Sequence, residues 1–190
     1  MQSDSTIVAR VLNGDANAFE PLVVRYKAHV MKIVTRHVPY QEAEELAQDI
    51  FIRAYTSLPT YKEKSGFKPW LSTVAVRACY DYWRKRYRSK EIPLSELTEN
   101  HQHWLETAAG DRSGTADEDG LAQKEAREVL DWALARLTAE DRMVLELTFL
   151  QGYSGQEAAA LLGWSVANVK VRAHRSRKKL KNILSETMAR

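Results

Sequence analysis

Apolar residues recur every three to four positions along most of the chain, which is the period of helices that bury one face. Early in the chain, the pattern predicts helices over about 15–36, 41–57 and 69–89, with Pro39 and Pro59 between them. Further helices are predicted over about 121–137, 138–150, 154–163 and 166–186. No segment alternates between apolar and polar residues as a strand does, so we expect an all-α protein.

The stretch between these two groups of helices differs in composition. Residues 91–120 contain few large apolar side chains and include Pro93 and the run AAGDRSGTADEDG. Such a segment cannot bury a core and is typical of a linker. We therefore predict two small helical domains, residues 1–90 and 121–190, joined by an acidic flexible linker over 91–120.

The overall composition excludes several classes of protein. Hydrophobic residues make up 44% and charged residues 28% of the 190 residues, which is typical of a soluble globular protein. No apolar run approaches the roughly 18 residues of a membrane helix, and the first residues do not resemble a secretory signal. The one cysteine, Cys79, excludes an intramolecular disulfide, so a reducing cytoplasmic location is expected.

Charge is distributed unevenly along the chain. The net charge is +3, but residues 51–90 carry +8 and residues 166–190 carry +7, with −7 over 91–120 between them. One basic block is usually a solvated face. Two blocks, each at the end of a helical module, favour contact with a polyanion at two places.

The segment from Ser154 to Lys181 has the pattern of a helix-turn-helix motif. A short helix, SGQEAAALL, is followed by the turn GWS and a longer basic helix. Ser154 and Glu157 fit a capping box, and Gly163 suits the left-handed end of the first helix. The alternative is a helical hairpin within a bundle, which predicts mixed charge on the outer side of the second helix. That side carries no carboxylate, so the segment favours DNA binding.

In such motifs the second helix enters the major groove, and its N-terminal part contacts base edges. The candidates for reading bases are Lys170, Val171, His174 and Arg175. The candidates for phosphate contacts, which position the helix without specifying sequence, are Arg172, Arg177, Lys178 and Lys179.

The predicted helix near residues 70–88 interleaves aromatic and basic side chains. A helical projection places Arg77, Tyr80, Trp83 and Arg84 on one face. Each aromatic taken alone is compatible with an ordinary core position. Arginines on the same face favour a surface that stacks unpaired bases and attracts phosphates, as strand-separated DNA or RNA requires.

The segment EAEELAQD over 42–49 carries four carboxylates in one predicted helix. Glu42, Glu45 and Asp49 share a face, and Gln48 lies beside Asp49. A metal site is one interpretation, although no His or Cys lies nearby. A solvated face is a second interpretation, and a docking surface for a basic partner is a third.

Three segments together resemble the extracytoplasmic-function (group 4) sigma factors of bacterial RNA polymerase, over nearly the whole chain. They are EAEELAQDIFIRAY at 42–55, FKPWLSTVAVRACYDYWRKR at 67–86, and the segment 133–180 that contains the helix-turn-helix. In this family they correspond to the clamp-binding helix, the promoter-melting and −10-reading segment, and the −35-reading domain.

The resemblance implies that Glu45, Gln48 and Asp49, with Glu42 on the same face, bind the polymerase clamp. It implies −10 contacts through the loop from Tyr61 to Phe67, including Lys62, and through the helix that follows. It implies −35 contacts by Lys170, Val171, His174, Arg175 and Arg177. The implied partners are core RNA polymerase, duplex and single-stranded promoter DNA, and an anti-sigma factor.

Two positions depart from the family. Arg77 stands where many relatives have Asn, which affects the expected −10 preference, and Thr138 stands where the family usually has Pro. A DNA-binding regulator would share the helix-turn-helix but would need neither the acidic nor the aromatic–basic helix. An enzyme is the third class; the sequence has no glycine-rich phosphate loop and no cluster of metal ligands, so no cofactor and no catalytic residue are expected.

Overall fold

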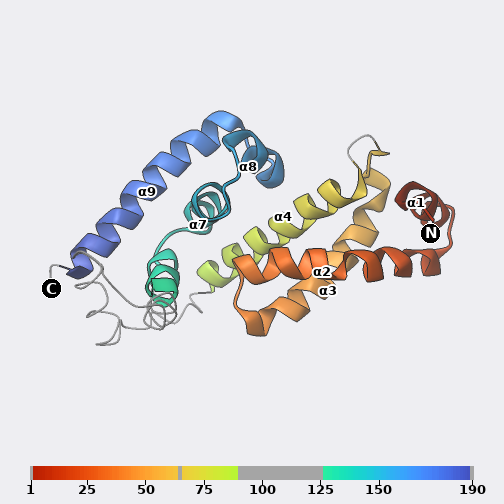
Figure 1. Ribbon diagram of the computed structural model, residues 1–190, viewed down its shortest axis with the longest axis horizontal. Coiled ribbons are helices and arrows are strands. Elements are labelled where there is room, and N and C mark those ends of the chain that lie inside the picture. The colour runs from red at the N-terminus through yellow and green to blue at the C-terminus, as the bar shows by residue number, and fades with distance from the viewer. Residues whose placement is uncertain (1, 64–65, 90–125, 189–190) are drawn as a thin grey trace, which may run out of the picture. The chain divides into compact units, whose positions relative to one another are not determined.

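The computed structural model describes residues 2–63, 66–89 and 126–188 (Figure 1). Within these ranges every regular element is helical, which confirms the predicted all-α fold. The predicted linker over 91–120 lies outside the described residues, as do Lys64 and Ser65 of the predicted −10 loop. Of the helices described, none combines the length and apolar composition that a bilayer-spanning segment needs.

The N-terminal elements follow the predicted proline boundaries closely. They are α1 (Asp4–Leu12), the 3-10 turn η1 (Ala16–Phe19), α2 (Glu20–His37), α3 (Tyr40–Ser57), the 3-10 turn η2 (Leu58–Thr60) and α4 (Phe67–Arg88). Pro39 separates α2 from α3, and Pro69 lies in the first turn of α4, where its missing N–H costs nothing.

Helix α1 was not predicted from the apolar pattern. The Ser3 hydroxyl caps it by accepting a hydrogen bond from the Thr6 N–H at 3.2 Å. Ile7, Val8 and Val11 are buried on its inner side. Asp4 binds both Arg25 and Tyr26, which ties this short helix to α2. Burial, with the hydrogen bond to Asp4, raises the pKa of Tyr26 to about 12.

The later elements begin with a helical segment over 126–134. They continue with α7 (Ala139–Leu145), the π-helical turn η4 (Glu146–Leu150), α8 (Gly155–Leu162) and α9 (Val166–Met188). The helix predicted over 138–150 thus changes geometry after Leu145. Thr138 caps α7 as predicted, accepting a hydrogen bond from the Asp141 N–H at 3.2 Å.

The chain divides into two compact units, one of Met1–Trp83 with Ser154–Val166, and one of Arg84–Tyr153 with Ala167–Arg190. In the first unit, α2, α3 and α4 bury an aliphatic core that includes Leu22, Val30, Ile50, Leu71 and Ala75. In the second unit, Leu134, Leu137 and Leu145 form a cluster against which Leu180 and Ile183 of α9 pack. The predicted domain boundaries at 90 and 121 stay a prediction.

Candidate nucleic-acid interface

One face of α9 is turned towards the protein interior. Val169 and Ser176 are buried. The other positions of that face, Ala173, Leu180, Ile183 and Leu184, are half-buried. Spacings of three, four and seven residues put these side chains on one side of the helix, which fixes the other side outward.

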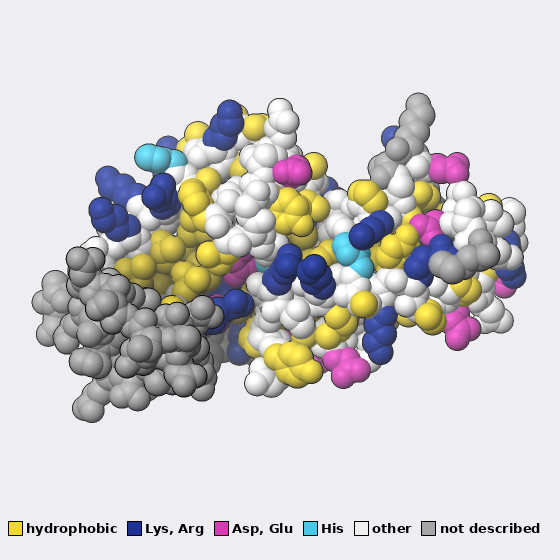
Figure 2. Space-filling model, viewed as in Figure 1, with side chains coloured by type: hydrophobic (Ala, Val, Ile, Leu, Met, Phe, Trp, Pro, Cys, Tyr) yellow, Lys and Arg dark blue, Asp and Glu magenta, His cyan; other side chains and the backbone are white. Residues whose placement is uncertain are grey.

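The opposite face of α9 is exposed and basic. Its exposed residues are Lys170, Val171, His174, Arg175, Arg177, Lys178 and Lys181. Figure 2 shows Lys and Arg side chains gathered with a His side chain along α9. The Arg177 guanidinium lies 5.4 Å from the centre of the exposed Phe149 ring, an arrangement that limits its freedom by a cation–π contact. This surface combines positive charge with one apolar side chain, Val171, which is 50% exposed.

Sequence reasoning missed a buried carboxylate that holds α9. Asp141 of α7 accepts hydrogen bonds from Arg172 at 3.1 Å, Ser176 at 2.8 Å and Lys179 at 2.5 Å. Burial alone would raise the pKa of Asp141, but the bonds from Lys179 and Ser176, with both cations nearby, hold that pKa below its usual value. Arg172 and Lys179, predicted as phosphate contacts, are therefore bound within the protein.

The first helix of the motif has the predicted caps. Ser154 accepts a hydrogen bond from the Glu157 N–H at 3.2 Å, and the Glu157 carboxylate accepts one from the Ser154 N–H at 2.8 Å. These two bonds also hold the pKa of Glu157 below its usual value. Gly163 ends α8 with φ 72°, in the left-handed region that favours glycine. The predicted short helix, three-residue turn and long helix are confirmed as elements.

On α4, the basic members of the predicted DNA-binding face are exposed, and the aromatic members are not free. Arg77 and Arg84 are exposed, while Tyr80 is half-buried. The Tyr80 ring lies edge-on to Trp164 with their ring centres 5.8 Å apart. This face therefore exposes Arg77 and Arg84, while Tyr80 packs against another ring of the protein.

The prediction that Trp83 offers an exposed stacking platform is wrong. Trp83 is 4% exposed, and its indole N–H donates a hydrogen bond to the His37 carbonyl oxygen at 2.7 Å. The large apolar area of an indole stabilises a core, and its one donor finds a backbone partner. Trp83 therefore fastens α4 to the end of α2 and does not present a surface to DNA.

The ends of the predicted −10 loop are anchored by an aromatic cluster. Phe67 packs with Tyr26, Tyr61 and Trp70, at ring-centre distances of 5.3, 5.8 and 5.4 Å. Phe67 is 2% exposed, so its predicted contact with a −10 base is corrected to a supporting role. Tyr61 is half-buried, with its pKa raised by burial, and Lys62 is exposed.

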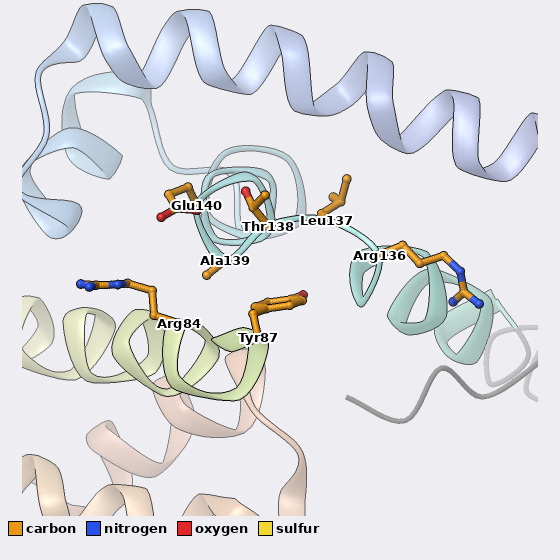
Figure 3. Close-up of a pocket in the computed structure, with 7 residues that line it drawn as sticks. All are labelled: Arg84, Tyr87, Arg136, Leu137, Thr138, Ala139 and Glu140. Carbon is orange, nitrogen blue, oxygen red and sulfur yellow. The ribbon is translucent and has the colours of Figure 1, made fainter. Parts of the chain in front are cut away.

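The last turn of α4 borders a shallow pocket of about 350 Å³ in the second unit (Figure 3). Arg84 and Tyr87 form one side, and residues 136–140 form the other. The Tyr87 hydroxyl donates a hydrogen bond to the Leu134 carbonyl oxygen at 3.1 Å, and burial raises its pKa. Of Arg84 and Tyr87, therefore, only Arg84 is exposed to solvent.

The acidic face of α3 lies partly in solvent. Glu45 and Gln48 are exposed, and Glu42 and Asp49 are half-buried. Arg53 donates hydrogen bonds to Asp49 at 2.8 Å and to Asp81 of α4 at 3.0 Å. Ile52, one turn beyond Gln48, is 62% exposed. Acidic and apolar side chains thus share the exposed face of α3. Within the described residues, no group of three or more His, Cys, Asp or Glu side chains could hold a metal ion.

Comparison with known proteins identifies two regions of the chain. Residues 22–89 match sigma-70 region 2, and residues 127–180 match sigma-70 region 4. The ECF RNA polymerase sigma-E factor of Escherichia coli strain K12 is 30% identical over 180 residues, which cover 95% of this chain and 93% of that protein. The sigma-E factor of Haemophilus influenzae is 29% identical over 188 residues, which cover 98% and 97%.

Two solved structures share the fold. One is described as CnrH in complex with the cytosolic domain of CnrY, with a TM-score of 0.53, 24% identity, and coverage of 97% of this chain and 99% of that chain. The other is described as the sigma factor RpoE in complex with the anti-sigma factor NepR from Bartonella quintana, with a TM-score of 0.51, 22% identity, and coverage of 88% and 96%. Because both sigma-70 regions match in order and a relative of this identity spans nearly the whole chain, the protein belongs to the ECF family of RNA polymerase sigma factors.

Proposed function

We propose that this sigma factor reads the −35 element with the exposed face of α9 and opens the −10 element with α4 and the loop before it. One observation supports the proposal most strongly. The exposed face of α9 carries Lys170, His174, Arg175 and Lys178 around Val171, and the helix has no carboxylate between Val166 and Ser185. Lys and Arg side chains pair with guanine, and an apolar side chain can meet a thymine methyl in the major groove.

The proposed −10 surface combines exposed basic side chains with half-buried aromatic side chains. Lys62, Arg77 and Arg84 attract phosphates, and the half-buried rings of Tyr61 and Tyr80 are the candidates for stacking on unpaired bases. Phe67 and Trp83 are buried, and they stabilise the loop and helix α4 respectively. We propose the boundaries 1–90, 91–120 and 121–190 for the −10 domain, the linker and the −35 domain.

We propose that Glu42, Glu45, Gln48 and Asp49 of α3 dock on a basic surface of core RNA polymerase. In this account RNA synthesis is catalysed by the polymerase, and the chain supplies specificity without catalysing a reaction. We infer a cytoplasmic location, because transcription by bacterial RNA polymerase takes place there. We also propose regulation by an anti-sigma factor, since the similar RpoE structure is described as a complex with one.

The first prediction concerns this docking surface. Replacing Glu45 by arginine should weaken binding to core RNA polymerase by about 1–3 kcal/mol, because a misplaced charge then faces the basic partner. Glu45 is a cleaner site than Asp49, whose carboxylate takes part in the bridge to Arg53. Fluorescence titration with core polymerase measures the change.

Glu44 provides the matched control for the Glu45 substitution. It is exposed on the same helix but lies about 100° away around the axis. Glu44→Arg makes the same change in net charge, and it should leave the affinity for core polymerase close to that of the wild type. Equal losses in the two variants would show that net charge, and not this face, governs binding.

The second prediction separates the two kinds of DNA contact on α9. Arg175→Ala should reduce discrimination at one −35 base pair by roughly 1–3 kcal/mol if its contact is bidentate. Lys178→Ala should weaken binding to all sequences about equally and reduce the salt dependence by about one phosphate contact. Binding to a randomised −35 library measures both effects. A uniform loss in both variants would overturn this division.

The proposed function is tested by run-off transcription with purified core polymerase. We expect initiation at a defined start when the chain and core polymerase are mixed, and no defined start from either component alone. A requirement for another sigma factor would instead identify the chain as an accessory DNA-binding regulator.

A further inference from the structure

Three donors from α9 converge on one buried carboxylate of α7. Asp141 is 2% exposed and accepts hydrogen bonds from Arg172, Ser176 and Lys179 at 3.1, 2.8 and 2.5 Å. Two of the donors are cations, so these are charge-assisted bonds, which are shorter and stronger than neutral ones. The arrangement joins segments that are 31 to 38 residues apart in the sequence.

The geometry constrains the rotation of α9 about its own axis. Positions 172, 176 and 179 are spaced by four and three residues, so the three donors share one face of the helix. The backbone of Asp141 is fixed in turn by its own helix, because the Asp141 N–H donates a hydrogen bond to the cap residue Thr138 at 3.2 Å. A turn of α9 that would move Val171 or Arg175 relative to the DNA would stretch all three bonds.

The same bonds restrain two cations that would otherwise be available to DNA. The Arg172 and Lys179 side chains are 34% and 57% exposed, so each can reach solvent while bound to Asp141. A cation bound to an internal carboxylate displaces fewer counterions from DNA than a free one does, and counterion release dominates sequence-independent affinity.

We propose that Asp141 is a positioning residue for promoter recognition, which fixes the rotation of α9 and withholds Arg172 and Lys179 from DNA phosphates. Asp141 thus favours the correct −35 sequence over other DNA by aligning the reading face and by lowering non-specific attraction. This inference rests on the proposed −35 function of α9.

The test is Asp141→Asn in the full chain, because asparagine keeps the shape and some hydrogen bonding while removing the charge. Binding is measured to a short duplex selected by the wild type from a randomised library, and to a scrambled duplex, over a salt series. We expect affinity for the scrambled duplex to rise, with a salt slope steeper by about 0.9 for each added phosphate contact. We expect the ratio of selected to scrambled affinity to fall about tenfold or more, since several base contacts depend on one alignment.

Two further variants make the outcome specific. Glu44→Gln changes the net charge equally at an exposed position of α3, and it should preserve the affinity ratio. Ser176→Ala removes one buried bond without changing charge, so it should lower the ratio and leave the salt slope unchanged. A merely destabilised Asp141→Asn protein would bind both duplexes more weakly in proportion, with an earlier thermal transition, and that result would overturn the proposal.

The binding experiment distinguishes an error in the role of Asp141 from an error in the proposed −35 function. If the wild type selects no preferred duplex, the −35 function is wrong, whatever Asp141 does. If the wild type is selective and Asp141→Asn matches it in both the ratio and the salt slope, the role of Asp141 is wrong and the −35 function stands.

Discussion

Replacing Trp83 by alanine is expected to lower the free energy of unfolding of the first unit by about 3–5 kcal/mol. The substitution removes a buried indole from between α4 and the end of α2, and it leaves the His37 carbonyl oxygen without its 2.7 Å donor. Urea denaturation followed by circular dichroism measures the loss. A pre-melted promoter should not rescue transcription by this variant, because the defect lies in the fold and not in strand separation.

Trp83→Phe provides the graded control for this experiment. It keeps most of the buried apolar area but lacks the indole N–H, so it should cost less than the alanine substitution, about 1–3 kcal/mol. The interpretation would be contradicted if Trp83→Ala unfolded like the wild type and lost only open-complex formation, with recovery on the pre-melted template. That result would restore Trp83 as a base-stacking residue.

Replacing Glu146 by leucine is expected to destabilise the second unit by about 3–5 kcal/mol. The Arg142 guanidinium donates to the Glu146 carboxylate at 2.7 Å, and these two side chains are only 7% and 3% exposed. Removing the carboxylate takes the 2.7 Å partner from a buried cation, and the Asp131 carboxylate oxygen at 3.9 Å is too distant to replace that bond. Denaturation monitored by circular dichroism again gives the magnitude.

The double variant Arg142→Met with Glu146→Leu tests whether the loss of stability comes from the buried charge or from altered packing. An apolar pair of similar volume avoids a buried charge that has lost its main partner, and such replacements are often neutral or stabilising. We therefore expect the double variant to be more stable than Glu146→Leu alone. If the double variant is the less stable one, the loss in the single variant reflects shape and packing, not the lost ion pair.

Most helix boundaries were predictable because local chemistry sets them. Pro39, Thr138, the Ser154–Glu157 capping box and Gly163 each act within a few residues of their own position. The outward face of α9 was predictable for the same reason, since helical periodicity alone separates buried Val169 and Ser176 from exposed Val171 and Arg175.

What the sequence could not give depends on contacts between distant segments. Trp83 shares a helical face with Arg77 and Arg84, and only the packing of α4 against the carbonyl of His37 shows that it is buried. Asp141 reads as an ordinary first-turn carboxylate of α7, because its partners lie 31 to 38 residues further along. Helix α1 is too short for its periodicity to be decisive, and its bonds to Arg25 and Tyr26 are also long-range.

The most direct test of the central claim is transcript sequencing from a promoter library randomised across the −35 and −10 regions, with core polymerase and the chain as the only proteins. The account predicts defined starts that require the chain, preceded by two enriched sequence blocks at promoter spacing. It further predicts that Arg175→Ala changes the upstream block and leaves the downstream block as it is. Initiation that is independent of the chain, or a single enriched block that Arg175→Ala does not alter, would contradict it.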